Sequence, residues 1–266
     1  MRLICACAAL AGLLVFSGCA DLRAGVYRSY PENTFPELET WAVLGFDNES
    51  GSVHAPDGQT AEVEFTHLFA VELAKFKGVR VIHPERTLME ASRLNLRIDP
   101  QKGVEEVLKL GRALKADAVV LGTITTYNAF PPPRMGVALQ VFRTKSRSVG
   151  ASDIERLVQS GKPIAIERGK EGYVAASFEK VYDAHHDTTR WALQGFAKAH
   201  SQNDFGGNDF EWSAMYVRPI WFEFVATSLI REIMKTGQEI KDKTPPPAKE
   251  PAPSAQAQTD SKTPAF

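Results

Sequence analysis

Residues 118–127, Ala-Val-Val-Leu-Gly-Thr-Ile-Thr-Thr-Tyr, give the clearest indication of the fold. This stretch is rich in β-branched residues and its first half is apolar on both faces, which is typical of a central strand. Residues 136–142 form a second apolar stretch after Pro131-Pro132-Pro133. This arrangement predicts two antiparallel strands joined by a stiff proline loop.

Before and after these two strands, the spacing of apolar residues alternates between the spacing typical of a strand and that typical of a helix. Further strands are predicted over residues 41–46, 79–83 and 173–182. Helices are predicted over residues 59–77, 85–96, 104–115, 188–200 and from 212 to about 240. In the helix over 188–200, we expect Trp191, Leu193 and Phe196 to face inward. Helices that link strands favour parallel pairing, so the sequence predicts an α/β fold: a layered, mixed β-sheet of about five strands with flanking helices.

Sequence composition indicates one domain with additional segments before and after it. Residues 1–18 are predicted to be a signal peptide, and residues 19–39, which show no sustained period, a tether. The α/β domain is expected over 40–240, with a polar insertion at about 143–172. The segment 241–266 is rich in Pro and Ala, so it cannot bury enough apolar surface to offset ordering and is predicted to be a disordered tail.

The N-terminus carries an export signal that ends at Cys19. Arg2 precedes a short apolar run from Leu3 to Phe16, which is too short to span a bilayer but suits a cleaved signal peptide. The ending Phe16-Ser17-Gly18-Cys19 resembles the lipobox of bacterial lipoproteins, in which the cysteine is acylated; Phe16 stands where Leu is usual. The alternative is an ordinary signal peptide that happens to contain cysteines.

The cysteine count favours acylation of Cys19. The chain has three cysteines, Cys5, Cys7 and Cys19, and cleavage after residue 18 leaves one. A single thiol in an exported chain cannot form an internal disulfide, whereas a multiply acylated cysteine gives lasting membrane attachment. Ala20 is not the aspartate that retains lipoproteins in the inner membrane, so the expected location is the periplasmic face of an outer membrane.

Several segments in order resemble a known family of periplasmic domains. They are Ala42-Val-Leu-Gly-Phe-Asp-Asn48, a helix ending Leu73-Ala-Lys-Phe76, the strand Val79-Arg-Val-Ile-His83, and Leu110 to Ile124. This series is similar to the domain shared by CsgG-type curli-secretion lipoproteins, the penicillin-binding-protein activator LpoB, the PelC lipoprotein and the N-terminal domain of TolB. The resemblance covers about residues 41–142 and implies architecture rather than an activity.

Two features of that family are not matched by this chain. Residues 143–172 are too polar and irregular for the lipid-facing strands of a secretion pore. LpoB-like activators carry a long proline-rich linker before the domain, whereas the proline-rich segment here follows it. We therefore expect neither a pore nor an LpoB-type reach through the cell wall.

Potential metal ligands cluster closely in the sequence only at Asp183-Ala-His185-His186-Asp187. Adjacent histidines on a strand point to opposite faces, so they would chelate one ion only in a turn, and no Cys or HExxH sequence completes a site. A solvated strand-to-helix loop, with Asp187 capping the next helix, is the favoured interpretation. The alternative is a metal-dependent hydrolase that uses these four residues; His54, His67, His83 and His200 are scattered and are expected to be surface or locally bonded.

The remaining patterns exclude some function classes and leave others open. A net charge of −1 gives no basic face for nucleic acid, and there is no Walker sequence or nucleophile elbow. Trp212, Trp221, Phe222 and Phe224 could form a partner surface, although aromatic residues at helical spacing usually form core. Both proline triplets could be docking peptides, although a hairpin loop suits Pro131 to Pro133 better.

The sequence therefore predicts a non-catalytic envelope lipoprotein with no cofactor. It would be anchored to the lipid bilayer through Cys19 and act as an accessory or assembly factor in envelope biogenesis, secretion or cell-wall synthesis. Its expected partners are envelope proteins of unknown identity, and self-association into a ring is an alternative assembly.

Overall fold

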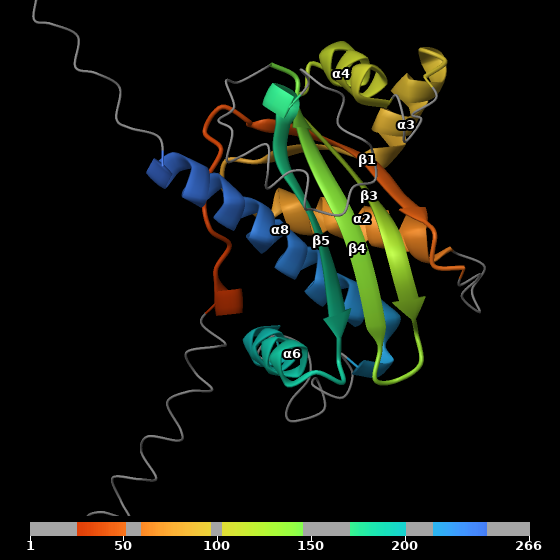
Figure 1. The fold of residues 1–266 in the computed structure, drawn as a ribbon, viewed down its shortest axis with the longest axis vertical. Helices are drawn as coiled ribbons and strands as arrows, with labels where there is room; N and C mark the ends of the chain where they lie inside the picture. Colours follow the sequence, from red (N-terminus) through yellow and green to blue (C-terminus); the bar gives the residue numbers. More distant parts are fainter. Residues whose placement is uncertain (1–25, 52–59, 97–102, 146–170, 201–214, 244–266) are drawn as a thin grey trace, which may run out of the picture.

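The computed structural model describes residues 26–51, 60–96, 103–145, 171–200 and 215–243 (Figure 1). The segments predicted as signal peptide, most of the insertion, and the tail from residue 244 onward lie outside this description, as does Cys19. The elements, in chain order, are β1 (Thr40–Asn48), α2 (Ala61–Ala74), β2 (Arg80–Ile82), α3 (Pro84–Arg93), α4 (Gly103–Ala113), β3 (Ala118–Asn128), β4 (Arg134–Arg143), η1 (Glu171–Tyr173), β5 (Val174–Asp183), α6 (Asp187–His200) and α8 (Arg218–Lys243).

The five strands form one mixed sheet in the order β2-β1-β3-β4-β5. β2, β1 and β3 run parallel because helices connect them, and β3, β4 and β5 pair antiparallel. The predicted fold class is therefore confirmed. The strand over residues 118–127 is the central one, as its sequence indicates.

Successive side chains of β3 enter two different cores, as a strand covered by helices on both faces requires. Val120 and Ile124 belong to the larger core, which α2, α6 and α8 complete on one face of the sheet. Val119 and Leu121 belong to a smaller core that α4 covers on the other face. In Figure 1, α2 and α8 lie together behind the sheet, and α3 and α4 lie side by side at one of its ends.

Residues 26–39 pack on the domain, so the prediction of a tether is wrong for this part of the segment. Phe35 and Leu38 are buried, and the ring of Tyr27 lies edge-on to the ring of Phe196, with 5.6 Å between their centres. Thr34 Oγ1 donates a hydrogen bond of 2.6 Å to the carbonyl oxygen of Met234 in α8. Apart from a helical turn at residues 26–28 and a β-bridge between Glu32 and Lys77, the segment is irregular chain held by side-chain contacts, so its sequence shows no sustained period.

A buried carboxylate joins this segment to two helices. Glu72 of α2 is 1% exposed, and its Oε2 accepts hydrogen bonds from Thr227 Oγ1 of α8 at 3.0 Å and from Tyr30 at 3.4 Å. Lys75 pairs with the other carboxylate oxygen. Burial raises the pKa of Glu72, and the lysine and the threonine oppose that rise. These contacts satisfy a charge that would otherwise destabilise the interior.

Two other details differ from the predictions. Trp191 of α6 is 45% exposed, whereas Leu193 and Phe196 are buried as expected, because an amphipathic helix buries only one stripe. The last helix, α8, extends from Arg218 to Lys243, past the expected boundary of the tail. Residue 212, where this helix was predicted to start, lies outside the described residues. No helix in the described parts of the chain combines the length and apolarity needed to cross a bilayer.

Candidate functional site

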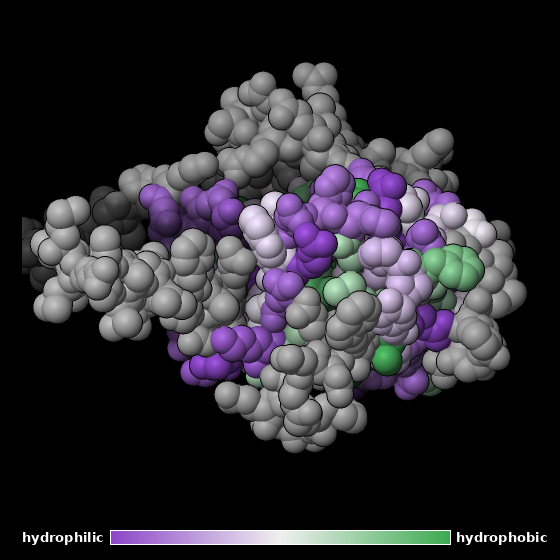
Figure 2. All heavy atoms as spheres, turned by 90° about the horizontal axis from the view of Figure 1, so that it is seen from below, coloured by the Kyte–Doolittle hydropathy of each residue, from purple (hydrophilic) through white to green (hydrophobic). Residues whose placement is uncertain are grey.

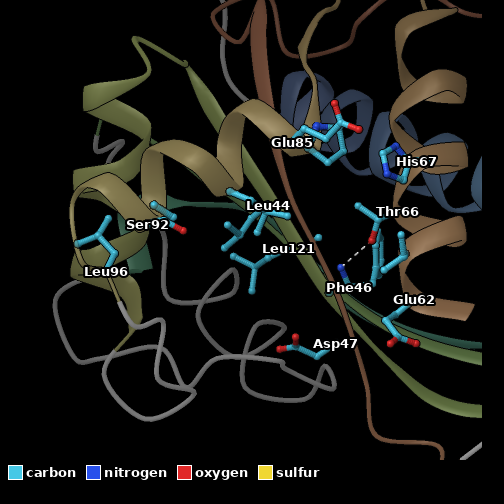
Figure 3. Close-up of a pocket in the computed structure, with 16 residues that line it drawn as sticks. Leu44, Phe46, Asp47, Glu62, Thr66, His67, Glu85, Ser92, Leu96 and Leu121 are labelled. Carbon is cyan, nitrogen blue, oxygen red and sulfur yellow. Dashed lines mark hydrogen bonds between the residues drawn. The ribbon is translucent and has the colours of Figure 1, made fainter. Parts of the chain in front are cut away.

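A cavity of about 390 Å³ opens between α2 and α3, beside the carboxyl half of β1 (Figure 3). This volume falls within the usual size range of ligand pockets. Apolar side chains form part of its wall, among them Leu44, Leu88, Leu96 and Leu121. The polar groups at the cavity are Asp47, Glu62, Thr66, His67, Glu85 and Ser92.

The position of the cavity follows from the order of the strands. From β1 the chain passes through α2 to β2 on one side of β1, and it later reaches β3 on the other side. In open α/β sheets, such a reversal leaves a crevice outside the carboxyl ends of the strands, where ligands bind. Asp47 near the end of β1 and Gly122 of β3 both line the cavity, so it lies at this crevice.

A bulge in β1 shapes the wall of the cavity. β1 has one extra residue relative to β3 between Val43 and Gly45, and Gly45 has a φ of 138°, a conformation that side chains with a Cβ rarely adopt. Next to the bulge, the amide of Phe46 donates a hydrogen bond of 3.0 Å to Thr66 Oγ1 of α2. Phe46 can therefore face α2, where its ring packs edge-on against Phe65.

Two carboxylates at the cavity affect each other. Partial enclosure raises the pKa of Asp47, and the negative charge of Glu62 raises it further. Glu62 Oε2 accepts a hydrogen bond of 3.1 Å from Asn48 Nδ2, which holds the carboxylate near the end of β1. The cavity therefore offers a concentrated negative charge that a cationic or hydrogen-bond-donating ligand would neutralise.

Replacing Asp47 with Asn is expected to make the protein slightly more stable at neutral pH. Because the folded-state pKa of Asp47 is raised above 3.8, the folded protein holds its proton more tightly than the unfolded chain, and stability falls as the pH rises through that interval. Asn carries no charge, so this loss disappears. The gain at pH 7 should be below about 1 kcal/mol, since solvent screens a group at the rim.

The measurement is the difference in urea midpoint between the wild type and Asp47→Asn at several pH values from 3.5 to 7. We expect the difference to be smallest at the acidic end and to grow toward neutrality. A difference that stays constant with pH would contradict the raised pKa.

Three potential metal ligands lie together beside this cavity, and two of them, His67 and Glu85, are part of its lining. His67 comes from α2, His83 immediately precedes α3, and Glu85 lies in the first turn of α3. One ligand atom from each lies within 4.8 Å of the others, and His83 Nδ1 is 3.7 Å from Glu85 Oε2. Figure 3 shows the side chains of His67 and Glu85 on facing helices at the cavity. From their sequence positions these histidines are expected to be scattered, so this arrangement was not predicted.

The Asp183–Asp187 segment has a different geometry. Asp183 Oδ1 accepts a hydrogen bond of 2.9 Å from the amide of His185, while its Oδ2 lies 3.7 Å from Arg134 Nε and 4.0 Å from His186 Nε2. Asp187 begins α6 and pairs with Arg190 instead. Within the described residues, these four side chains do not converge on one point as His67, His83 and Glu85 do. This geometry supports the interpretation as a strand-to-helix loop.

The aromatic residues at the start of α8 form core rather than a partner surface. Trp221, Phe222 and Phe224 are at most 2% exposed, and Phe222 packs edge-on against Phe65 of α2. Trp212 lies outside the described residues. For these three residues the hypothesis of an exposed partner surface is wrong, because the stripe they form on α8 faces the sheet.

Comparison with known proteins gives no family for this chain. No protein-family model matches it, and no curated protein matches it. Among solved structures, it is similar to the C-terminal domain of LpoB from Salmonella enterica, with 12% identity over 55% of this chain and 82% of that one and a TM-score of 0.33.

Two other solved structures are similar over more of the chain. Lipoprotein GNA1162 from Neisseria meningitidis has 13% identity over 73% of this chain and 96% of its own, with a TM-score of 0.35. The hypothetical protein CT253 from Chlamydia trachomatis has 12% identity over 75% and 98%, with a TM-score of 0.36. At these identities and TM-scores no function is transferred, and the α/β architecture rests on the strands and helices described above.

Proposed function

We propose that this protein is a non-catalytic, lipid-anchored lipoprotein of the bacterial envelope that acts through protein contacts as an accessory or assembly factor. The processes that suit such a factor are envelope biogenesis, secretion and cell-wall synthesis. The observation that carries the proposal is the apolar export segment that ends in Phe16-Ser17-Gly18-Cys19, after which the mature chain has no second cysteine.

The packing of the N-terminal segment limits how far the domain could lie from a membrane to which Cys19 is anchored. Tyr27 and Phe35 contact the core, so only the few residues between Cys19 and Val26 remain to span the distance to a membrane. Fully extended, they reach at most about 25 Å, compared with roughly 70 Å for a free tether up to residue 39. A domain anchored in this way would meet partners close to the bilayer surface.

Exposed aromatic residues at one end of the domain support a role in protein contacts. Phe130 in the β3–β4 turn is 81% exposed, Trp191 of α6 is 45% exposed, and Tyr216 before α8 is 59% exposed. Figure 1 places the β3–β4 turn, α6 and the start of α8 at the same end of the molecule. Viewed from below, hydrophobic residues appear at separate places among hydrophilic ones (Figure 2). Single aromatic anchors within a polar surface are typical of protein interfaces.

Replacing Cys19 with Ser is expected to move the protein from the membrane fraction to the soluble fraction and to change its electrophoretic mobility. The reason is that a hydroxyl cannot form the thioether to glycerolipid, and no described helix can hold the chain in a bilayer instead. Cys7→Ser is the matched control, because it changes a cysteine inside the predicted signal peptide and should leave attachment intact. Unchanged fractionation of Cys19→Ser would contradict the proposal.

Crosslinking in intact cells tests the part of the proposal that concerns partners. We expect the wild-type protein to be recovered with a specific envelope protein, and Phe130→Ala with Trp191→Ala to reduce that recovery without changing fractionation. Recovery of no specific partner from wild-type envelopes would count against an accessory role.

A further inference from the structure

We propose that His67, His83 and Glu85 bind one divalent transition-metal ion of the Zn²⁺ type at the rim of the cavity between α2 and α3. Two imidazole nitrogens and one carboxylate oxygen are a donor set that suits Zn²⁺. The three residues come from separate positions along the chain, and the fold brings one ligand atom of each within 4.8 Å of the others. Nothing in the proposed role as an accessory factor requires such a site.

The ligand atoms lie somewhat farther apart than they would around a bound ion, at up to 4.8 Å from one another. Ligand atoms around a tetrahedral Zn²⁺ lie about 2.0–2.1 Å from the metal and so about 3.3 Å from each other. His83 Nδ1 and Glu85 Oε2 are 3.7 Å apart. The ring centres of His67 and His83 are 5.2 Å apart, and two imidazoles on one tetrahedral ion would have centres about 5 Å apart. Small side-chain rotations would complete the geometry.

The backbone already places the three residues close enough for their side chains to converge on one ion. Pro84 occupies the first turn of α3 and keeps His83 in an extended conformation, with φ −59° and ψ 143°. The amide of Thr87 donates to the carbonyl oxygen of His83 at 3.2 Å, which fixes His83 to the start of α3. His67 follows Thr66, which is buried and bonded to the bulge of β1. Ion binding would therefore need side-chain motion only.

The side chains of His83 and Glu85 would have to rotate to bind the ion, and both are free to do so. The His83 side chain is 51% exposed and the Glu85 side chain is 74% exposed, so neither is locked by packing. The start of α3 carries a partial positive charge that disfavours a cation. Glu85 opposes this effect directly, and the carboxylates of Asp47 and Glu62 line the same cavity. These three carboxylates offset the positive charge at the start of α3.

A site with three protein ligands has a chemical consequence for the cavity. Tetrahedral Zn²⁺ takes four ligands, so one position would remain for water or for a donor atom of a molecule in the cavity. A molecule bound in the 390 Å³ cavity could then coordinate the ion through an anionic group or a nitrogen atom. The inference concerns binding and assigns no reaction.

The test uses the full chain, purified in detergent without a tag, stripped with EDTA and titrated with Zn²⁺ in a calorimeter. We expect one Zn²⁺ per chain, and Co²⁺ in its place should give the visible absorption of a tetrahedral site. His83→Gln with Glu85→Gln should weaken binding by more than about 100-fold, since loss of outer-shell partners alone costs about 10–100-fold. Equal thermal midpoints of metal-free wild type and variant would show that both are folded.

The matched control is His185→Gln with His186→Gln, which removes the two adjacent histidines of the Asp183–Asp187 loop. This variant should bind Zn²⁺ as the wild type does. The proposal is overturned if the wild type binds no Zn²⁺, if His83→Gln with Glu85→Gln binds it unchanged, or if the control variant loses it. The last result would instead assign the metal to the Asp183–Asp187 loop. Failure here leaves the role of Cys19 untouched, because fractionation is a separate measurement.

Discussion

Replacing Gly122 with Ala is expected to destabilise the domain by about 3 kcal/mol, the upper part of the usual range for overpacking. Phe46 of β1 pairs with Gly122 of β3, and the Phe46 ring lies over the glycine. An added Cβ would lie 2.4 Å from Cε1 of that ring and 2.8 Å from the carbonyl oxygen of Ala138. The ring cannot withdraw easily, because it is packed against Phe65 and Phe69 of α2.

Urea unfolding of the purified protein measures this effect, and Gly136→Ala is the matched control in the neighbouring strand. At Gly136 the nearest atom to an added Cβ is Thr125 Oγ1 at 2.7 Å, the end of a side chain that can rotate away. We expect the Gly136 variant to lose clearly less stability. Because the clash involves Phe46, Gly122→Ala should also cost less in a Phe46→Ala background. Equal midpoints for the two single variants would argue against the close contact of β1 and β3.

Replacing Phe35 with Ala is expected to cost about 3–5 kcal/mol, as for other buried aromatic residues cut back to a methyl group. Phe35 is 2% exposed, and its ring lies edge-on to that of Trp41, with 6.2 Å between centres. It also lies against Gly237 of α8, where an added Cβ would approach its Cε2 to 2.7 Å. The loss would be a large share of the 5–15 kcal/mol by which most domains are stable.

Phe130→Ala is the control for this experiment, because it makes the same chemical change at a side chain that is 81% exposed. Its thermal midpoint should match that of the wild type, whereas Phe35→Ala should unfold at a clearly lower temperature. If both variants unfold like the wild type, residues 26–39 are a free tether after all. The comparison therefore decides between the two descriptions of the N-terminal segment.

Most of the fold could be predicted from local patterns. The apolar stretch over 118–127 is the central strand, and the period of residues 59–77 identifies α2 because both signals depend only on neighbouring residues. The mixed pairing followed from the lengths of the connections. The exposure of Trp191 was predicted wrongly because helical spacing in a sequence does not specify how wide the buried stripe is.

The candidate site could not be predicted in the same way. His67 and His83 are sixteen positions apart, and no short motif joins them. They meet because α2 and β2 follow one another in a parallel crossover, and because Pro84 turns the chain into α3 directly after His83. Knowledge that ligands bind at the carboxyl ends of parallel strands could have pointed to the end of β1, but not to these side chains.

Local sequence patterns indicate which segments are strands and helices, and they include the Cys19 signal on which the proposed anchor depends, since both kinds of pattern lie in contiguous residues. Three features become visible only in the folded chain: residues 26–39 pack on α8, the aromatic residues of α8 are core, and ligand atoms of His67, His83 and Glu85 come within 4.8 Å of one another. The physical reason is that burial and ligand geometry depend on which faces meet across the fold, and residues far apart in sequence make those faces.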